Sequence, residues 1–252
     1  MDETPPTPEA RVEIHDELAS TSATAKERAA AGENGPLWIL ARRQTSGYGR
    51  RGDAWKSAVG DLMATRLFTL QADDPPPAQI SFVAAVAVGE ALRRLAPDAA
   101  PQLKWPNDVL VDGAKICGLL PELVTRDDPA SAICLGVGVN IVTAPQLPER
   151  ATVRLADLVV GPAPAPEAAL EAIEEAFAER LAEWRREGFE PIRRAWMDRA
   201  YGVGRRVCVA GAGEEKTGVI EGLEPDGALR LSDKGRIVRA RAGSLRFEPA
   251  SG

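Results

Sequence analysis

Three glycines and two arginines lie within six residues, in the segment 47–52 (GYGRRG). Glycine permits backbone conformations and close approaches that other residues disfavour, and adjacent arginines bring permanent positive charge to the same place. This combination is typical either of a loop that binds an anionic ligand or of a flexible basic turn on a surface. The six residues do not distinguish the two, so neighbouring motifs have to.

A second motif, KWPND, occupies residues 104–108, and Lys115 and Gly118 follow it closely. KWPND alone indicates no more than a capped turn with a buried aromatic residue. An Asp-Gly pair at 112–113 predicts a hairpin turn between two apolar runs, and this hairpin would return Lys115 toward Asp108. The missing side chain of Gly118 would let a ligand approach the sheet. A lysine, a carboxylate and a glycine gap facing one another suit the activation of a small carboxylic acid.

Composition excludes several function classes. The 252-residue chain has a net charge of −6, which argues against a general nucleic-acid binder. Its single histidine, His15, is predicted at a strand edge, which leaves little room for a catalytic triad or a histidine-rich zinc site. Three widely spaced cysteines predict reduced thiols and small core residues, hence a cytoplasmic protein. The chain has no secretory signal and no run of 18 apolar residues, so we expect no membrane association.

Hydrophobic periodicity predicts an α+β architecture with a mostly antiparallel sheet. Strands are expected at 11–18, 37–42, 62–70, 103–105, 108–124 and 131–141, and helices from the cap-forming residues 20–22, over 78–95 and over 170–184. Thr24 and Glu27 have capping-box spacing. The arginine-rich stretch 180–196 is expected to be one solvated amphipathic helix, and Gly136-Val137-Gly138 a close-packed strand rather than a dinucleotide site.

The sequence pattern changes after residue 203. Five short segments, 206–210, 216–223, 227–233, 236–242 and 244–248, are separated by glycine or Asp-Gly turns. This pattern predicts a small β-barrel. We therefore expect a catalytic domain over 11–200 and a second domain over 203–252.

The motifs GYGRRG followed by a tryptophan, KWPNDVLVDGAKICGLLPE and GVGVNI, in this order and spacing, resemble the biotin–protein ligase family. The resemblance extends from the STS at 20–22 to the C-terminal strands. It implies a class II synthetase-like α+β domain followed by an SH3-like barrel, in agreement with the elements above. It also implies ATP and Mg²⁺ as cofactors, biotin as the substrate, biotinyl-5′-AMP as the intermediate, and a lysine of a biotin carboxyl carrier domain as the acceptor.

The resemblance implies roles for individual residues. Biotin would contact Ser20, Thr21, Ser22, Gln44, Tyr48, Gly49, Arg50, Lys115 and Gly118, and the nucleotide would contact Arg50, Arg51, Trp55, Lys104, Asn107 and Asn140. Lys115, Arg50 and Asp108 would be catalytic. No dedicated metal site is implied, because Mg²⁺ would be held mainly by the phosphates of ATP. Glu122 is expected to serve packing or a hydrogen-bond network.

The chain departs from the family pattern at three positions. Ser22 replaces the asparagine of a Ser-Thr-Asn contact, and Tyr48 and Asp53 replace the first and last arginines of a GRGRRGR loop. The two loop changes remove two cations, which bears on how strongly the adenylate is retained.

Two alternative functions stay open. One is a lipoate or octanoate ligase or transferase of the same fold, although its usual glycine-rich RRxxGGG-type segment is missing. The other is a non-catalytic sensor of biotin or its adenylate. The few residues before the first strand predict a monofunctional ligase without a helix-turn-helix and without nucleic-acid binding. A homodimer is not excluded.

Overall fold

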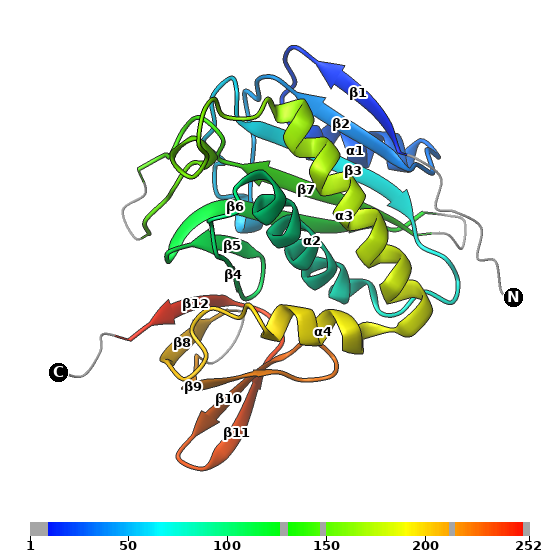
Figure 1. The fold of residues 1–252 in the computed structure, drawn as a ribbon. Coiled ribbons are helices and arrows are strands. Elements are labelled where there is room, and N and C mark those ends of the chain that lie inside the picture. Colours follow the sequence, from blue (N-terminus) through cyan, green and yellow to red (C-terminus); the bar gives the residue numbers. More distant parts are fainter. Residues whose placement is uncertain (1–9, 127–130, 147–149, 212–214, 249–252) are drawn as a thin grey trace, which may run out of the picture.

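The computed structural model describes residues 10–126, 131–146, 150–211 and 215–248, and its larger sheet has seven strands (Figure 1). The strands are β1 (Arg11–His15), β2 (Leu37–Ala41), β3 (Leu62–Thr69), β4 (Pro101–Lys104), β5 (Asp108–Val111), β6 (Ala114–Val124) and β7 (Ala132–Val139). They lie in the order β1-β2-β3-β7-β6-β5-β4. β1 pairs with β2 in parallel and the other neighbours are antiparallel, which confirms the predicted sheet. His15 lies in the edge strand β1, as expected.

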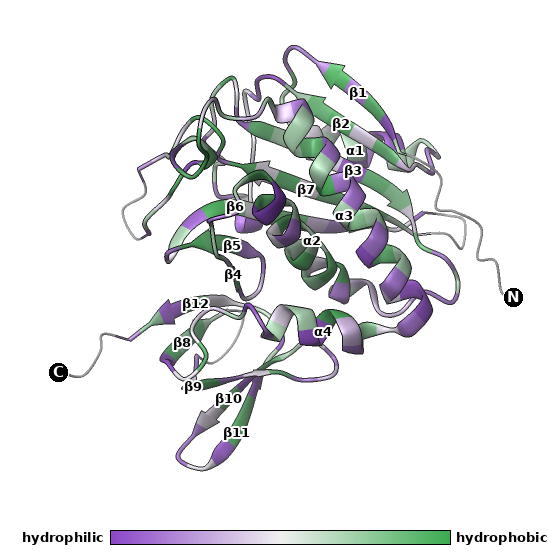
Figure 2. Cartoon of the chain, in the orientation of Figure 1, coloured by the Kyte–Doolittle hydropathy of each residue, from purple (hydrophilic) through white to green (hydrophobic). Residues whose placement is uncertain are grey.

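Helices cover both faces of this sheet. Helix α1 (Thr21–Ala30) lies on one face, and α2 (Ile80–Leu95) and α3 (Pro166–Glu187) lie on the other (Figure 1). The alternation of strand side chains sets the division. In β2, Ile39 packs with Ala25 of α1, whereas Trp38 belongs to the main core with residues of α2 and α3. Figure 2 shows α2 as mostly hydrophobic, because it is buried between the sheet and α3. No helix in the described ranges has the length and apolar character needed to span a membrane.

Helix α1 begins where the sequence predicts. Ser20 is its N-cap, and the Ser20 side chain accepts a hydrogen bond from the Ala23 N–H at 3.4 Å. The Thr24–Glu27 spacing does not mark a second start, since the Thr24 hydroxyl donates to the Ser20 carbonyl within the helix. The N-cap places residues 20–22, all buried, at the end of α1 that faces the sheet centre.

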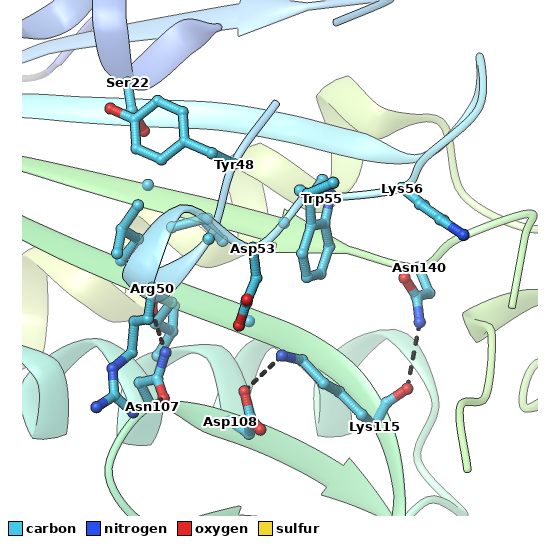
Figure 3. Close-up of a pocket in the computed structure, with 18 of the residues that line it drawn as sticks. Ser22, Tyr48, Arg50, Asp53, Trp55, Lys56, Asn107, Asp108, Lys115 and Asn140 are labelled. Atoms are coloured by element: carbon cyan, nitrogen blue, oxygen red, sulfur yellow. Dashed lines mark hydrogen bonds and ion pairs between the residues drawn. The ribbon is translucent and has the colours of Figure 1, made fainter. Parts of the chain in front are cut away.

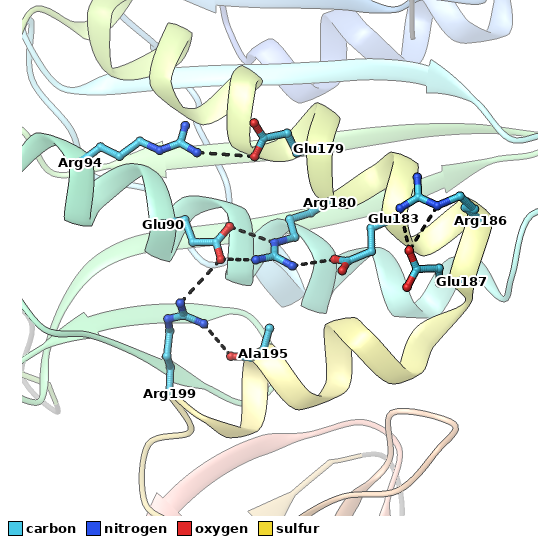
Figure 4. Close-up of polar contacts among 9 residues, drawn as sticks. All are labelled: Glu90, Arg94, Glu179, Arg180, Glu183, Arg186, Glu187, Ala195 and Arg199. Carbon is cyan, nitrogen blue, oxygen red and sulfur yellow. Dashed lines mark hydrogen bonds and ion pairs between the residues drawn. The ribbon is translucent and has the colours of Figure 1, made fainter. Parts of the chain in front are cut away.

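The prediction of a single helix over 180–196 is wrong. Gly188, with a φ of 76°, ends α3 and begins α4 (Phe189–Met197), because glycine accepts a backbone angle that breaks helical continuity. The stretch is also less solvated than expected. Arg180 donates to Glu90 of α2 and to Glu183, and Arg199 lies 3.6 Å from Glu90 (Figure 4). This ionic cluster ties α2, α3 and the end of α4 together.

The five C-terminal segments predicted as strands of a small barrel are strands, and they pair as one antiparallel sheet. They are β8 (Arg206–Ala210), β9 (Lys216–Leu223), β10 (Leu229–Asp233), β11 (Arg236–Ala240) and β12 (Ser244–Phe247), in the order β11-β10-β9-β8-β12. The main-chain N–H of Leu103 in β4 donates to Arg199, and that of Tyr201 donates back to Leu103. The chain between the two sheets is therefore fastened to the edge of the larger one.

The cysteines correct one expectation. Cys117 and Cys134 are buried core residues, and burial raises the pKa of both thiols to about 12. Cys208 is only half-buried in β8, so it is not a core residue. All three are free thiols, as predicted for a reducing environment.

Candidate active site

The floor of the candidate site is a row of residues that crosses four neighbouring strands. Met63 of β3 pairs with Gly138 of β7, Gly138 with Gly118 of β6, and Gly118 with Asp108 of β5. The two central positions lack side chains, so the sheet surface is hollow between Met63 and Asp108. The next position on the same face of β7, Gly136, packs closely under the Ser22 hydroxyl. A close-packed strand is therefore the correct interpretation of the Gly-Val-Gly pattern.

A cavity of about 400 Å³ lies over this floor, on the face of the sheet that α1 covers. All residues predicted from the sequence for the site line it: Ser20, Thr21, Ser22, Gln44, Tyr48, Gly49, Arg50, Arg51, Trp55, Lys104, Asn107, Asp108, Lys115, Gly118 and Asn140. The structure thus brings together segments that lie up to 120 residues apart (140 − 20) in the chain. Their individual roles stay predictions.

One end of the cavity is a neutral network, called here the hydroxyl end and made by residues 20–22, Gln44 and Thr65. Thr65 donates to Thr21 at 2.9 Å, and Thr21 donates to the Gln44 side-chain oxygen at 3.1 Å. A hydroxyl has one proton, so the 3.1 Å contact between Ser22 and Thr65 must be donated by Ser22. The chain of donors leaves the lone pairs of Ser22 and the amide nitrogen of Gln44 available to a ligand.

The opposite end, called here the cationic end, is built around Asp108 (Figure 3). The Lys115 ammonium lies 2.5 Å from one Asp108 oxygen, and Arg150 lies 3.5 Å from the other. The Lys115 and Asp108 side chains are each only 12% exposed. The predicted hairpin return is therefore confirmed.

Two further cations belong to the cationic end, Lys104 and Arg50. Burial lowers the pKa of both side chains, which means that neither charge is fully compensated within the protein. Arg50 donates to the Asn107 side-chain oxygen at 3.1 Å and to the carbonyl of Gly243 in the C-terminal region at 2.8 Å. Both acceptors are neutral. Asp53 points from the loop toward this end (Figure 3), but four cations still outnumber two carboxylates. The cationic end is therefore suited to a ligand with several negative charges.

Trp55 covers the glycine floor between the two ends. A β-carbon added at Gly118 or Gly138 would overlap its ring, and the Lys115 ammonium lies 5.3 Å from the ring centre. The gap beside Gly118 is thus filled by Trp55 in this structure. The indole N–H is buried and has no hydrogen-bond partner among the described residues.

Asn140 is buried at the edge of the cavity. Its side-chain nitrogen donates to the carbonyls of Lys115 and Val153, both at 3.2 Å. These bonds support the backbone that carries Lys115. A contact of Asn140 with the nucleotide stays a prediction.

Sequence reasoning missed Thr65, Lys26 and Arg150. Alternation along β3 places Thr65 two residues from Met63 on the same face, so periodicity could have found it. Lys26 follows Ser22 by one helical turn and bonds to Glu122, whose predicted place in a hydrogen-bond network is confirmed. Arg150 carries no comparable signal, because its irregular segment reaches Asp108 only through the tertiary fold.

Comparisons with known proteins indicate the family. Residues 17–140 match the model of the biotin/lipoate A/B protein ligase family. A biotin–[acetyl-CoA-carboxylase] ligase of Paracoccus denitrificans is 37% identical over 221 residues, which cover 85% of this chain and 92% of that protein. A bifunctional ligase/repressor of Bacillus subtilis (strain 168) is 30% identical over 231 residues, covering 86% of this chain and 68% of the relative.

A solved structure shows the same architecture. The biotin protein ligase from Aquifex aeolicus, in complex with biotin and ATP, matches with a TM-score of 0.82 at 25% identity. The match covers 94% of this chain and 99% of that one. The sequence match to the Paracoccus ligase along most of both chains decides the assignment: this chain belongs to the biotin–protein ligase family.

Proposed function

We propose that this enzyme joins biotin and ATP to form biotinyl-5′-AMP and pyrophosphate, and then transfers biotin to a lysine of a biotin carboxyl carrier domain. The observation that carries the proposal is the two-ended cavity, with a neutral hydrogen-bonding end and an end with excess positive charge. Membership of the biotin–protein ligase family supports it. The matched Aquifex structure holds biotin and ATP.

The chemistry of the two ends favours one orientation for biotin. Its ureido ring is neutral and offers two N–H donors and one carbonyl acceptor. The free lone pairs of Ser22 suit a ureido N–H, and the Gln44 amide nitrogen suits the ureido carbonyl. The biotin carboxylate would then point away from the hydroxyl end and toward Lys115, where a cation offsets its charge.

The first step brings two anions together, since a biotin carboxylate oxygen attacks the α-phosphorus of ATP and pyrophosphate leaves. Lys115 and Arg50 would offset the charge on the reacting carboxyl and phosphoryl groups. Lys104 and Arg150, which lie around the same carboxylate, would hold the phosphate tail. Among the described residues, Arg50 and Lys104 have no carboxylate partner of their own to give up when the phosphates bind.

Magnesium would enter on the phosphates of ATP and supply further charge neutralisation there. The described residues contain no group of three histidine, cysteine or acidic side chains that could hold a metal ion. Asp108 is a poor direct ligand, because both of its oxygens face cations. We therefore assign no protein ligand to the metal.

In the second step, the ε-amine of the carrier lysine attacks the acyl carbon of the adenylate and AMP leaves. The amine must lose a proton, and Asp108, the carboxylate nearest to Lys115, would accept it. The adenylate also reacts with water, so the loop around residues 46–57 would have to exclude solvent. The free thiols of the chain support a cytoplasmic location for this reaction.

Purified protein, biotin, ATP with Mg²⁺ and a biotin carboxyl carrier domain should yield biotinylated carrier and AMP. Absence of both adenylate and transfer would contradict the proposal. Tight biotin binding without pyrophosphate release would instead support a sensor. Lipoate in competition with biotin tests the second alternative: lipoate that displaces biotin at equal concentration would identify a lipoate ligase.

A further inference from the structure

Tyr48 stands where the family resemblance predicts an arginine. Its hydroxyl donates to one oxygen of Glu122 at 3.1 Å. The other Glu122 oxygen accepts from Lys26 at 2.8 Å, and the Lys26 ammonium lies 5.2 Å from the centre of the Tyr48 ring. These three residues come from the loop, from β6 and from α1. They form one contact across three elements, here called the Tyr48 anchor.

The loop that carries Tyr48 is a small closed unit. The Gly49 N–H donates to the Asp53 carbonyl at 2.7 Å, and the Trp55 N–H donates to the Gly47 carbonyl at 2.9 Å. Tyr48 also pairs with Ala54 as an isolated antiparallel bridge. A segment with such internal bonds moves as a body, so its position depends on where it is attached.

The loop has two attachments of different character. Arg50, at the tip, is held by the neutral oxygens of Asn107 and Gly243, and an anionic ligand would compete for its guanidinium. Tyr48, at the base, is held by a carboxylate that Lys26 already neutralises. An anion offers nothing to a phenol bonded in this way. Ligand binding can therefore redirect the Arg50 side chain while the backbone of the loop stays in place.

The tyrosine also fits its neighbours electrostatically. Hydrogen bonding to Glu122 raises the pKa of Lys26, so this lysine is charged throughout the physiological range. An arginine at position 48 would place a second cation beside Lys26. A neutral phenol shares Glu122 without that repulsion.

We propose that Glu122 and Lys26 are positioning residues, which hold the base of the 47–55 loop through Tyr48 so that the loop already covers the cavity before a ligand binds. The anchor itself consists of contacts within the protein and includes no ligand. Its expected consequence, slower release of biotinyl-AMP from the cavity, rests on the proposed function. The two parts can be tested separately.

The test is amide hydrogen exchange of the ligand-free protein, read at Gly49 and Trp55, in the Tyr48→Phe variant. Phenylalanine keeps the ring and removes the hydroxyl. Loss of one hydrogen bond should speed exchange of both amides about fivefold, with thermal unfolding nearly unchanged. Tyr201→Phe is the matched control, because Tyr201 is the only other tyrosine and its hydroxyl contacts Arg205 away from the loop. Unchanged exchange in Tyr48→Phe, or an equal change in Tyr201→Phe, would overturn the anchor.

A second variant separates positioning from general destabilisation. Lys26→Met leaves Glu122 able to accept from Tyr48 but removes its ion-pair partner. The double variant with Tyr48→Phe should exchange the Gly49 amide little faster than Tyr48→Phe alone. Additive effects would contradict a shared anchor. Release of biotinyl-AMP should be faster in Tyr48→Phe, and unchanged release alongside faster loop exchange would refute the functional part alone. Failure of the wild type to form adenylate would refute the proposed function and leave the exchange result standing.

Discussion

The two ends of the cavity differ in how completely their own partners satisfy them. At the hydroxyl end, the hydroxyls of Ser22, Thr65 and Thr21 each have an acceptor, and the nearby Tyr48 anchor pairs one cation with one carboxylate. At the cationic end, Lys104 and Arg50 are partly desolvated without compensating carboxylates of their own. The hydroxyls of the first end are paired within the protein, whereas the excess positive charge of the second end would be neutralised by a bound anion.

This difference explains how one cavity can serve two substrates. A neutral ring needs a preformed set of donors and acceptors, because hydrogen bonds to it are worth little if the site must first rearrange. A triphosphate brings its own charge, which repays the desolvation of buried cations. The desolvation of the cations at the cationic end is therefore unfavourable in the protein alone, and binding of the nucleotide would offset it. Four substitutions test this contrast.

Lys115→Ala should have the largest effect. Removing the ammonium between Asp108 and the reacting carboxyl should reduce adenylate formation by about 10²- to 10³-fold. Single-turnover formation of biotinyl-AMP measures it, and Lys216→Ala on the C-terminal sheet is the control. A loss of less than tenfold in a folded protein would mean that the cationic end is not where the chemistry occurs.

Arg50→Gly should act on retention more than on formation. Charged hydrogen bonds from its guanidinium would be lost, so biotinyl-AMP should leave about ten- to a hundredfold faster. Released adenylate should label lysines of a non-carrier protein such as albumin. Arg43→Ala, an exposed arginine paired with Glu17, should do neither. Adenylate retention equal to that of the wild type would refute the role of Arg50.

Ser22→Ala should affect the hydroxyl end alone. It removes an acceptor for the ureido group and the donor to Thr65, so the KM for biotin should rise about fivefold while the KM for ATP stays constant. Steady-state kinetics with each substrate varied measure the two constants, with Ser232→Ala as the control. A matching rise in the KM for ATP would show that the two ends are not independent.

Arg150→Ala should have the smallest effect. This side chain is 45% exposed, so solvent screens its charge, and we expect the KM for ATP to rise about threefold. The rise should shrink at high salt. Arg154→Ala is closely matched, with the same exposed fraction but a partner, Asp157, outside the site. If Arg154→Ala raised the KM for ATP equally, Arg150 would have no specific part in binding.

Much of the site could be predicted from local signals. Ser20 is a strong cap former ahead of an alanine-rich run, so the start of α1 and the position of its hydroxyls follow from the sequence. The Asp-Gly turn predicts the hairpin, and the hairpin brings Lys115 back to Asp108. Glu122 shares a strand face with Gly118, so alternation places it near the cavity.

Other features lay beyond local signals. The direction of α4 depends on its packing against α2, although Gly188 is itself a local signal for the end of α3. The contact of Arg50 with the Gly243 carbonyl joins residues 193 positions apart, and no periodicity encodes it. The same holds for Arg150, whose segment has no regular pattern.

The sequence by itself determined which groups are present and on which face of a helix or strand each one stands, because backbone geometry repeats every two or 3.6 residues. Its motifs resembled the biotin–protein ligase family, which the match to the Paracoccus ligase shows, and they named candidate residues that line one cavity. The tertiary structure decided how these groups pair: that Trp55 fills the gap over Gly118 and Gly138, that Asp108 is shared by two cations, and that Tyr48 donates to Glu122. Pairing depends on distances between separate elements, and those are set only when the whole core packs.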